Sequence, residues 1–375
     1  MKKLQLIITL SLFVTLCYPQ VTKLNNGTVF QFLEGPAWDG KGALYFSDQN
    51  GQKVYKYTPG IGFSVIRSGQ VTNGIAFDTT GLMYVCEQGS TNRVVKMDTN
   101  GVVKAVIASK YNNIGFNNPN DVCKDGKGGI YFSDPTWGTM VQDKKSVYYV
   151  NASGVITRIN GDFNRPNGLA LSPDKTLLYV DDTENKNVFA FDVQSDGSAI
   201  NQHVFCVLNM PAGTTTSGAD GLKVDSDGNL YITSTLGVQV FNSAGVWQRT
   251  ITVPEAPANV AFGGSDWSTL FITARTGLYS TQLTTHGIPF ITSIHNLNAD
   301  NLKFFPNPAC NNITIQNEAS ARLTVMNFLG QPVMEKFLPV NSDPIDISNI
   351  PNGIYVFKLK EKSRTISRKV VIKKQ

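Results

Sequence analysis

The chain has 375 residues, of which 41% are hydrophobic and 16% charged, and this composition excludes a largely disordered protein. Its formal charge of +5 is unevenly distributed, because residues 304–375 hold ten Lys and Arg against five Asp and Glu, whereas residues 4–303 sum to −2. The long N-terminal part therefore offers no electrostatic basis for binding nucleic acid or an anionic membrane.

Residues 1–20 are predicted to be a secretory signal peptide. Two lysines stand before an apolar run of about fifteen residues, which is the layout of such a peptide and is short for a membrane span. No later stretch is long and apolar enough to cross a bilayer, so we expect no stable transmembrane segment. The cysteines beyond the signal peptide have no CxxC pair and no nearby histidine, which leaves a disulfide or simple burial open and disfavours zinc. They are Cys86, Cys123, Cys206 and Cys310.

One phrase returns six times after the signal peptide. Its copies are EGPAWDGKGALYFSD, NGIAFDTTGLMYVCE, NDVCKDGKGGIYFSD, NGLALSPDKTLLYVDD, DGLKVDSDGNLYIT and NVAFGGSDWSTLFIT. Each copy has a short apolar strand, a tight turn of Asp, Gly or Ser, and a second strand rich in aromatic and branched residues. The copies start 39, 47, 47, 53 and 39 residues apart, which is close to the length of a propeller blade.

The repeat predicts an all-β fold, a six-bladed β-propeller over residues 21–297. Helical periodicity of useful length is absent between the copies, which argues against a sheet with crossover helices. We expect a strand around residues 28–33 to join the last blade and close the ring. A row of immunoglobulin-like domains is the alternative, but it needs units of about a hundred residues rather than about forty.

The first residue of each copy, which we call its head, carries a side-chain oxygen. The six heads are Glu34, Asn73, Asn120, Asn167, Asp220 and Asn259. The first strand of each blade is the innermost in a propeller, so equivalent positions converge on the axis. Six such side chains with two negative charges are costly to bury without partners, and they predict either one bound divalent cation or a channel of ordered water. Amide and carboxylate oxygens favour Ca²⁺, with Mg²⁺, Mn²⁺ and Zn²⁺ as alternatives.

Several strings carry a more specific resemblance. LEGPAW, NPNDV followed by FSDP, RPNGLALSPD, ADGLKVDSDGNLYIT and AFGGSDWSTLFIT resemble the gluconolactonase, senescence-marker-protein and luciferin-regenerating-enzyme family over most of residues 30–283. The resemblance implies a six-bladed propeller, lactone hydrolysis and one divalent metal at the axial mouth. It places the metal ligands at Glu34 by EGP, Asn167 by PNG and Asp220 by DG, and it makes the Asn of NDV a ligand or a substrate contact. We take that residue, Asn120, as the fourth ligand and leave Asn73 and Asn259 to line the pocket or hold water.

Opening a lactone requires a polarised carbonyl and a delivered water, and a metal with an open coordination position can supply both. The base that takes the water proton is assigned to Asp220, which the resemblance nominates, or to Asp121 directly after Asn120. Asn118, in the loop before NDV, is a candidate substrate contact. The histidines lie outside the heads, so neither a Ser-His-Asp triad nor a histidine-based site is expected. They are His203, His286 and His295.

Residues 298–375 are predicted to form a separate small β-sandwich. The blade phrase stops near Leu297, and short alternating strands with Gly-Gln and Pro-Asn-Gly turns follow. The elements FPNPA, DISNIPNGIYVFKL and KVVIKK, in that order, resemble the C-terminal sorting domain of the type IX secretion system, a device of the Bacteroidota. That resemblance implies export through the periplasm and the outer membrane, to the cell surface or beyond. A carbohydrate- or protein-binding β module is the alternative, although the tail has no aromatic platform to support it.

Together these features predict a secreted, monomeric, metal-dependent hydrolase that opens a sugar lactone or a related cyclic ester. Two alternatives stay open at this point. One is a non-catalytic propeller that binds a ligand and keeps the metal for structure, and the other is a metal-dependent phosphotriesterase or arylesterase. A propeller by itself does not decide among them, because the fold hosts many functions.

Overall fold

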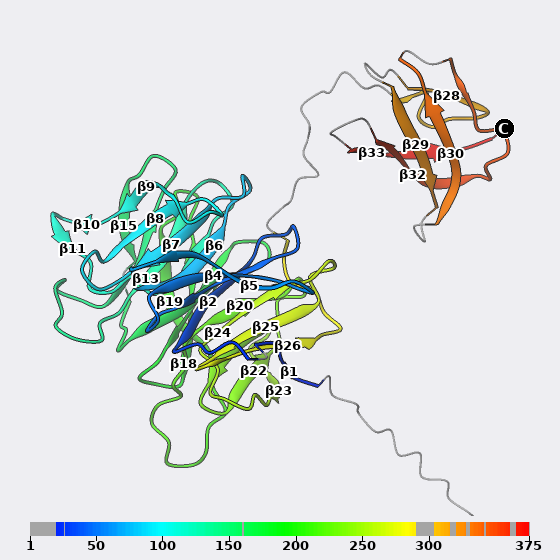
Figure 1. Ribbon diagram of the computed structural model, residues 1–375. Coiled ribbons are helices and arrows are strands. Elements are labelled where there is room, and N and C mark those ends of the chain that lie inside the picture. Colours follow the sequence, from blue (N-terminus) through cyan, green and yellow to red (C-terminus); the bar gives the residue numbers. More distant parts are fainter. Residues whose placement is uncertain are drawn as a thin grey trace, which may run out of the picture. The chain divides into compact units, whose positions relative to one another are not determined.

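The computed structural model describes residues 20–25, 27–159, 161–289, 304–315, 320–327, 331–340, 343–360 and 365–374. The chain divides into two compact units, residues 1–292 and 293–375 (Figure 1). The described residues form strands and turns and no helix, so the all-β prediction is confirmed. Most of the predicted signal peptide and the expected boundary at residues 297 and 298 lie outside these described ranges.

The N-terminal unit contains six four-stranded antiparallel sheets in its described part. The first three, each from inner to outer strand, are β2 (Leu33–Trp38), β3 (Leu44–Asp48), β4 (Lys53–Thr58) and β5 (Gly62–Ser68); β6 (Thr72–Phe77), β7 (Met83–Glu87), β8 (Arg93–Met97) and β9 (Val103–Ala108); and β12 (Val122–Lys124), β13 (Ile130–Asp134), β14 (Ser146–Val150) and β15 (Ile156–Ile159). The next three are β16 (Pro166–Leu171), β17 (Leu177–Asp182), β18 (Asn187–Val193) and β19 (Ala199–Val207); β20 (Leu222–Val224), β21 (Leu230–Ser234), β22 (Gly237–Phe241) and β23 (Trp247–Ile251); and β24 (Asn259–Gly263), β25 (Thr269–Ala274), β26 (Gly277–Gln282) and β1 (Thr22–Lys23). A small hairpin of β10 (Lys110–Tyr111) and β11 (Ile114–Gly115) precedes the third sheet.

The six inner strands contact one another in a closed ring. Contacts run from β2 to β6, β12, β16, β20 and β24 in chain order, and β24 returns to β2. At one equivalent position of the second strand, every sheet buries an aromatic side chain, and the repeated phrase marks this position with Tyr or Phe. These residues are Tyr45, Tyr84, Tyr131, Tyr179, Tyr231 and Phe271. The ring of sheets is a β-propeller, as the repeat predicts.

An acidic residue ends the second strand in four of the sheets, and in three of them it anchors the chain that enters the inner strand. Asp48 Oδ1 accepts the backbone N–H of Phe32 at 2.9 Å, and Asp134 Oδ1 accepts that of Asn118 at 2.8 Å. Asp182 makes the same contact with Arg165 at 2.9 Å. Because each entering segment leads directly into a head, these buried carboxylates fix where the heads begin.

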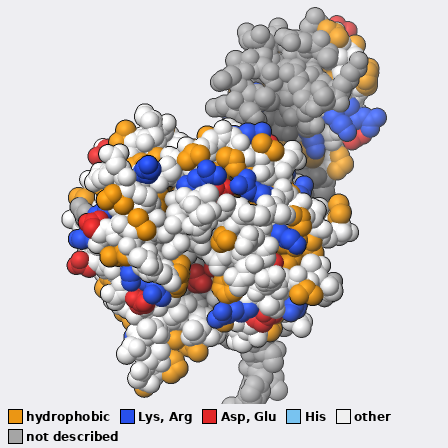
Figure 2. Space-filling model, turned by 60° about the vertical axis from the view of Figure 1, so that its left-hand side comes forward, with side chains coloured by type: hydrophobic (Ala, Val, Ile, Leu, Met, Phe, Trp, Pro, Cys, Tyr) orange, Lys and Arg blue, Asp and Glu red, His pale blue; other side chains and the backbone are white. Residues whose placement is uncertain are grey.

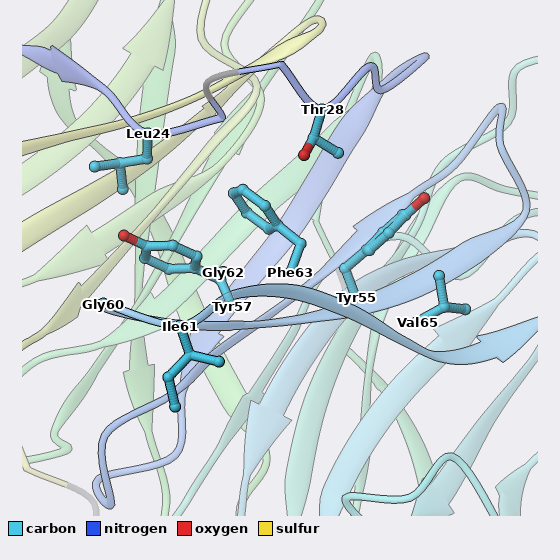
Figure 3. A pocket seen from close by; sticks show the side chains of 9 residues that line it. All are labelled: Leu24, Thr28, Tyr55, Tyr57, Gly60, Ile61, Gly62, Phe63 and Val65. Carbon is cyan, nitrogen blue, oxygen red and sulfur yellow. The ribbon is translucent and has the colours of Figure 1, made fainter.

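The ring closes at residues 22–25, so the prediction that residues 28–33 form the closing strand is wrong. Thr22 and Lys23 in β1 pair with β26, and the backbone N–H of Leu24 donates to Leu278 O at 2.8 Å. Residues 28–32 lead into β2 instead, because Asp48 binds the backbone at that point. Leu24 also packs on the hydrophobic cluster with Tyr57 and Phe63 (Figure 3), so the closing segment joins the last sheet to the first.

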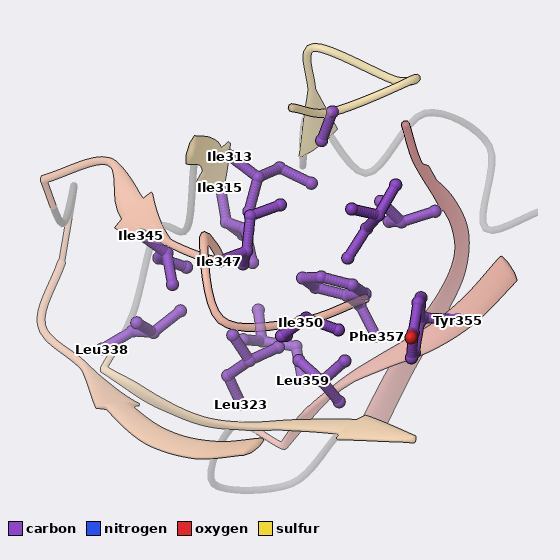
Figure 4. Close-up of a cluster of buried hydrophobic side chains, with 14 of the residues drawn as sticks. Ile313, Ile315, Leu323, Leu338, Ile345, Ile347, Ile350, Tyr355, Phe357 and Leu359 are labelled. Carbon is purple, nitrogen blue, oxygen red and sulfur yellow. The ribbon is translucent and has the colours of Figure 1, made fainter. Parts of the chain in front are cut away.

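The C-terminal unit is a small β-sandwich, as predicted. One sheet holds β27 (Phe304–Phe305), β28 (Asn312–Ile315) and β31 (Ile345–Asp346), and the other holds β29 (Ala321–Met326), β30 (Pro332–Leu338), β32 (Gly353–Lys360) and β33 (Thr365–Ile372). Side chains of both sheets meet in one core, where Ile313 and Ile345 face Leu323 and Phe357 (Figure 4). In β32 buried and exposed residues alternate, which is the pattern of a strand with one face on a core.

The surface and the cysteines agree with the sequence analysis. On the face in Figure 2, basic and acidic side chains are interspersed and hydrophobic ones form small separate groups. Cys86, Cys123, Cys206 and Cys310 are free thiols. In the part of the chain that the structure describes, no helix is long and apolar enough to cross a membrane.

Candidate active site

The heads lie where the inner strands begin. Glu34, Asn73, Asn167 and Asn259 belong to β2, β6, β16 and β24, and Asn120 comes two residues before β12. These five are at most 3% exposed. Asp220, two residues before β20, is partly exposed.

Glycines after the heads allow neighbouring inner strands to approach closely. A Cβ atom on Gly74 would lie 2.6 Å from Asn120 O, and one on Gly168 would lie 2.5 Å from Asp220 O. The backbone N–H of Gly74 donates to Asn120 O at 2.8 Å. Four heads in the sequence are followed by Gly for this reason, and the ring around the axis is as tight as backbone contact permits.

Two of the four predicted metal ligands, Asn167 and Asp220, are joined by a hydrogen bond. Asn167 Nδ2 donates to Asp220 Oδ1 at 2.8 Å and to Thr183 Oγ1 at 3.1 Å. The carboxyl group of Glu34 interacts electrostatically with that of Asp220. Asn120 is buried in the neighbouring part of the ring, where its backbone carbonyl accepts Gly74 N–H.

The two carboxyl groups in this ring are strained electrostatically. Burial, followed by repulsion from Asp220, raises the pKa of Glu34 well above its ordinary value. Burial and repulsion from Asp121 raise the pKa of Asp220 to about 7, against the opposing effect of the Asn167 hydrogen bond. A cation between them would relieve both effects, since an opposite charge favours the ionised form.

Two amide oxygens in the ring lack partners. Asn73 Oδ1 and Asn167 Oδ1 are buried and accept no hydrogen bond from any described group. Carbonyl and carboxylate oxygens are the ligands that hard cations take, so the donor set fits a divalent ion. Among the described residues no group of three or more His, Cys, Asp or Glu is arranged to hold a metal, and the proposed set has only two carboxylates, completed by amides.

Asp121 is the second candidate base. Its side chain contacts residues of two other sheets, Lys223 and Asn259. It stands where four other copies have Gly, and it is 1% exposed. Its carboxylate accepts Val122 N–H at 2.9 Å, Lys223 Nζ at 3.3 Å and Asn259 Nδ2 at 3.4 Å. An ion-paired and enclosed carboxylate has less freedom to take a proton from water than the partly exposed Asp220.

Asp181 is a further buried acid that the sequence analysis missed. It is fully buried in β17, its Oδ1 accepts Gly168 N–H at 3.0 Å, and its Oδ2 has no partner among the described groups. Burial, then repulsion from Asp220, raises its pKa well above the ordinary value. The signal was present in the repeat, because this position is Ser, Cys, Ser, Thr or Thr in the other copies and Asp only here.

Asn118 lies two residues before the head Asn120 and is partly exposed. Its Nδ2 donates to Asn92 Oδ1 at 3.4 Å, and its Oδ1 accepts Trp137 N–H at 3.5 Å. The ring of Trp137 is half exposed and stacks 4.5 Å from the guanidinium of Arg165. Asn118 therefore joins two loops next to the heads, and a contact with substrate stays a prediction.

The histidines that the structure describes take no part in this site. His203 and His286 are exposed. The ring Nδ1 of His203 lies 3.0 Å from Asn201 O, and that of His286 lies 2.9 Å from Asp266 O, both within hydrogen-bonding distance. His295 lies outside the described residues.

The fold and the heads define a β-propeller with an oxygen-lined site at its axis. Comparison with known families identifies the family to which it belongs. Residues 32–276 match the SMP-30/Gluconolactonase/LRE-like region, and the chain belongs to this family. Residues 303–373 match a secretion system C-terminal sorting domain.

Individual relatives are similar over most of their own length. A gluconolactonase of Zymomonas mobilis is 29% identical, in a match that covers 68% of this chain and 80% of the relative. The pentonolactonase XacC of Haloferax volcanii is 26% identical over 65% of this chain and 81% of its own length. Among solved structures, the gluconolactonase XC5397 of Xanthomonas campestris is similar with a TM-score of 0.62 and 28% identity, covering 71% of this chain and 95% of that one.

Proposed function

We propose that the propeller is a metal-dependent lactonase that opens a sugar lactone or a related cyclic ester. The observation that carries the proposal is the ring of heads, which combines two carboxyl groups with raised pKa values and two buried amide oxygens without partners among the described groups. Relatives named gluconolactonase and pentonolactonase support the choice of a sugar lactone as substrate. Oxygen-only donors and two negative charges favour Ca²⁺, with Mg²⁺, Mn²⁺ and Zn²⁺ less suited.

In the proposed mechanism Glu34, Asn120, Asn167 and Asp220 hold the cation. The bound cation supplies Lewis acidity, which polarises the lactone carbonyl and lowers the pKa of water. Asp220 takes the proton of the attacking water while Asn167 Nδ2, at 2.8 Å, keeps its carboxylate in place. The water oxygen adds to the carbonyl carbon, the ring C–O bond breaks, and the released alkoxide takes up a proton to give the hydroxy acid.

The other residues are assigned supporting parts. Asn118 contacts the substrate from the outer loops, and Asn73 and Asn259 line the pocket or hold water. Asp121 is kept as the second candidate base, although its contact with Lys223 favours a role in balancing the charge of the ring.

The proposed setting is outside the cytoplasm. The sorting domain at residues 303–373 supports export by a secretion system. We infer that this is the type IX system of the Bacteroidota, that residues 1–20 direct the chain to the periplasm, and that the propeller acts as a monomer at the cell surface or beyond.

The test is a panel of aldonolactones and simple cyclic esters assayed with and without a chelator. We expect turnover that EDTA abolishes and Ca²⁺ restores, and one tight divalent ion per chain by metal analysis. Glu34→Gln and Asp220→Asn should each lose the ion and at least about a hundredfold in kcat/KM. Asp227→Asn is the matched control, because Asp227 is an exposed acid on the β20–β21 turn.

Three outcomes would contradict the proposal in different ways. Retention of the ion by both Glu34→Gln and Asp220→Asn would refute the metal site. Absence of turnover for every lactone while the ion is bound would favour a binding module. Turnover of aryl esters or phosphotriesters alone would keep the metal and change the substrate class.

A further inference from the structure

The side-chain amide of Asn167 is held in one orientation. Its Nδ2 donates to Asp220 Oδ1 at 2.8 Å and to Thr183 Oγ1 at 3.1 Å, so each of its two hydrogens has an acceptor. Its Oδ1 is buried and accepts no hydrogen bond from any described group. A hard cation binds the oxygen of an amide rather than its nitrogen. This orientation therefore leaves the atom that a cation needs without a competing partner.

The hydroxyl group of Thr183 can only accept in its contact with Asn167. Its single hydrogen is donated to Ala219 O at 2.7 Å, and a backbone carbonyl has no hydrogen to return. If the amide of Asn167 turned over, its Oδ1 would face the Thr183 oxygen with no hydrogen between them. Such a contact leaves two acceptors opposed in a part-buried place, which is unfavourable.

Asp220 favours the same orientation only while its carboxyl group is ionised. In the proposed mechanism Asp220 takes a proton, and a protonated carboxyl group donates as well as accepts. The hydroxyl group of Thr183 stays neutral, and its hydrogen remains bonded to Ala219 O. The contact with Thr183 can therefore hold the amide of Asn167 in both protonation states of Asp220.

The same hydroxyl group also holds the segment that enters the next head. Ala219, whose carbonyl it binds, is buried and directly precedes Asp220. An equivalent contact occurs two sheets earlier, where Gln88 Nε2 donates to Pro119 O at 3.0 Å and Pro119 directly precedes Asn120. Gln88 and Thr183 each follow the second strand of their sheet. Thr183 in addition contacts the side chain of a head, and so it joins two of the predicted ligands.

An asparagine head does not offer a free oxygen without such support. Asn259 Oδ1 accepts the backbone N–H of Val260 at 2.8 Å, so its amide oxygen is occupied. The amide oxygen of Asn167 is buried to a similar degree and has no such partner. The hydrogen bonds of the two amides, rather than their residue type, separate a candidate ligand from a residue that lines the pocket.

We propose that Thr183 is the positioning residue of the metal site. It orients Asn167 so that Oδ1 is presented to the ion, and it fixes the backbone that carries Asp220. Thr183 itself binds neither the ion nor the substrate. The inference rests on the proposed function, because it concerns an ion held by Asn167 and Asp220.

The test is equilibrium binding of Ca²⁺ to the full chain, measured by competition with a chromophoric chelator. Thr183→Val keeps the shape of the side chain without the hydroxyl group and should raise the Ca²⁺ Kd at least about tenfold. Thr183→Ser keeps the hydroxyl group and should bind within about threefold of the unmodified chain. Thr79→Val, a change of an exposed threonine between β6 and β7, is the matched control and should leave the Kd unchanged.

Circular dichroism of each variant separates loss of orientation from loss of fold, and Thr183→Ala takes the place of Thr183→Val if the valine variant does not fold. Equal Ca²⁺ affinity of the hydroxyl-free variant and the unmodified chain would refute the inference and leave the proposed function intact. Failure of Thr183→Ser to restore binding would also refute it. Absence of Ca²⁺ binding by the unmodified chain would instead refute the proposed calcium site, and this inference with it.

Discussion

The Asp220 carboxyl group carries a pH dependence that can be measured. Its pKa is about 7 in the folded chain without metal, against an ordinary value of 3.8. The folded state therefore holds a proton that the unfolded state releases between these values, and its free energy of unfolding falls as the pH rises from about 4 to about 7. Glu34, whose pKa is also raised, acts in the same direction.

We expect thermal unfolding in EDTA, followed by circular dichroism, to give a lower midpoint at pH 8 than at pH 5. Added Ca²⁺ should raise the midpoint more at pH 8, where both carboxyl groups are ionised. Asp220→Asn should flatten the EDTA profile and Asp227→Asn should leave it unchanged. A midpoint of the unmodified chain that rises from pH 5 to pH 8 would contradict this account.

Single residues of the site differed in how far sequence could predict them. The ring of heads followed from a six-fold repetition, since residues equivalent in each blade must converge on one axis. Asp181 did not, because it occurs once and at a position filled by small polar residues elsewhere. The contacts of Asp121 with Lys223 and Asn259 were also beyond sequence, because they join residues 102 and 138 positions apart.

At the scale of the strands, the close approach of β6 and the β12 entry segment depends on Gly74. A Cβ there would lie 2.6 Å from both Asn120 O and Asp121 Cα. Gly74→Ala should lower the free energy of unfolding by about 2–4 kcal/mol, because backbone rather than a flexible side chain must move. Gly115→Ala, whose Cβ would meet open space, is the control. Equal stability of the two variants in urea would contradict the tight ring.

The closing strand depends on the side chain of Asn25. Its Nδ2 donates to Thr276 O at 3.0 Å and Thr28 O at 3.1 Å, and its Oδ1 accepts Leu278 N–H at 3.0 Å. Asn25→Ala should cost about 2–3 kcal/mol, since it leaves buried backbone groups without partners. Exposed Asn100→Ala should cost less than about 0.5 kcal/mol in the same urea titration. A small effect of Asn25→Ala would show that the ring closes without this contact.

The error about ring closure has a physical cause. A closing strand of two residues has no periodicity of its own, whereas residues 28–33 are longer and more apolar. Their place was decided by Asp48, whose carboxylate holds that segment at the first sheet rather than the last.

For the whole molecule, the two units each have their own core, and they are expected to unfold separately. Among the described residues, the core of the C-terminal unit is formed by buried side chains between Ala309 and Ile372, with Phe304 packed against it. Calorimetry of the full chain should show two transitions, and a chain ending at residue 292 should retain the propeller transition within about 2 °C. It should also retain lactonase activity. A single transition lost on truncation would contradict this independence.

Export should require the sorting domain. In a bacterium with a type IX system, the chain without residues 293–375 should remain in the periplasm, while the full chain reaches the surface or the medium. Fractionation and immunoblotting measure this, and Lys110→Met in the full chain serves as a matched exported control. Normal export of the truncated chain would refute the proposed role of the sorting domain in secretion.

The sequence by itself determined the all-β propeller, the heads and the separate tail. Strand alternation and turn residues are local properties, and they recur in each of the six copies of the repeat. Only the tertiary structure decided which strand closes the ring and which acids, such as Asp181 and Asp220, act on one another. Those features depend on charges and backbones brought together across the axis, and no spacing along the chain records such distances.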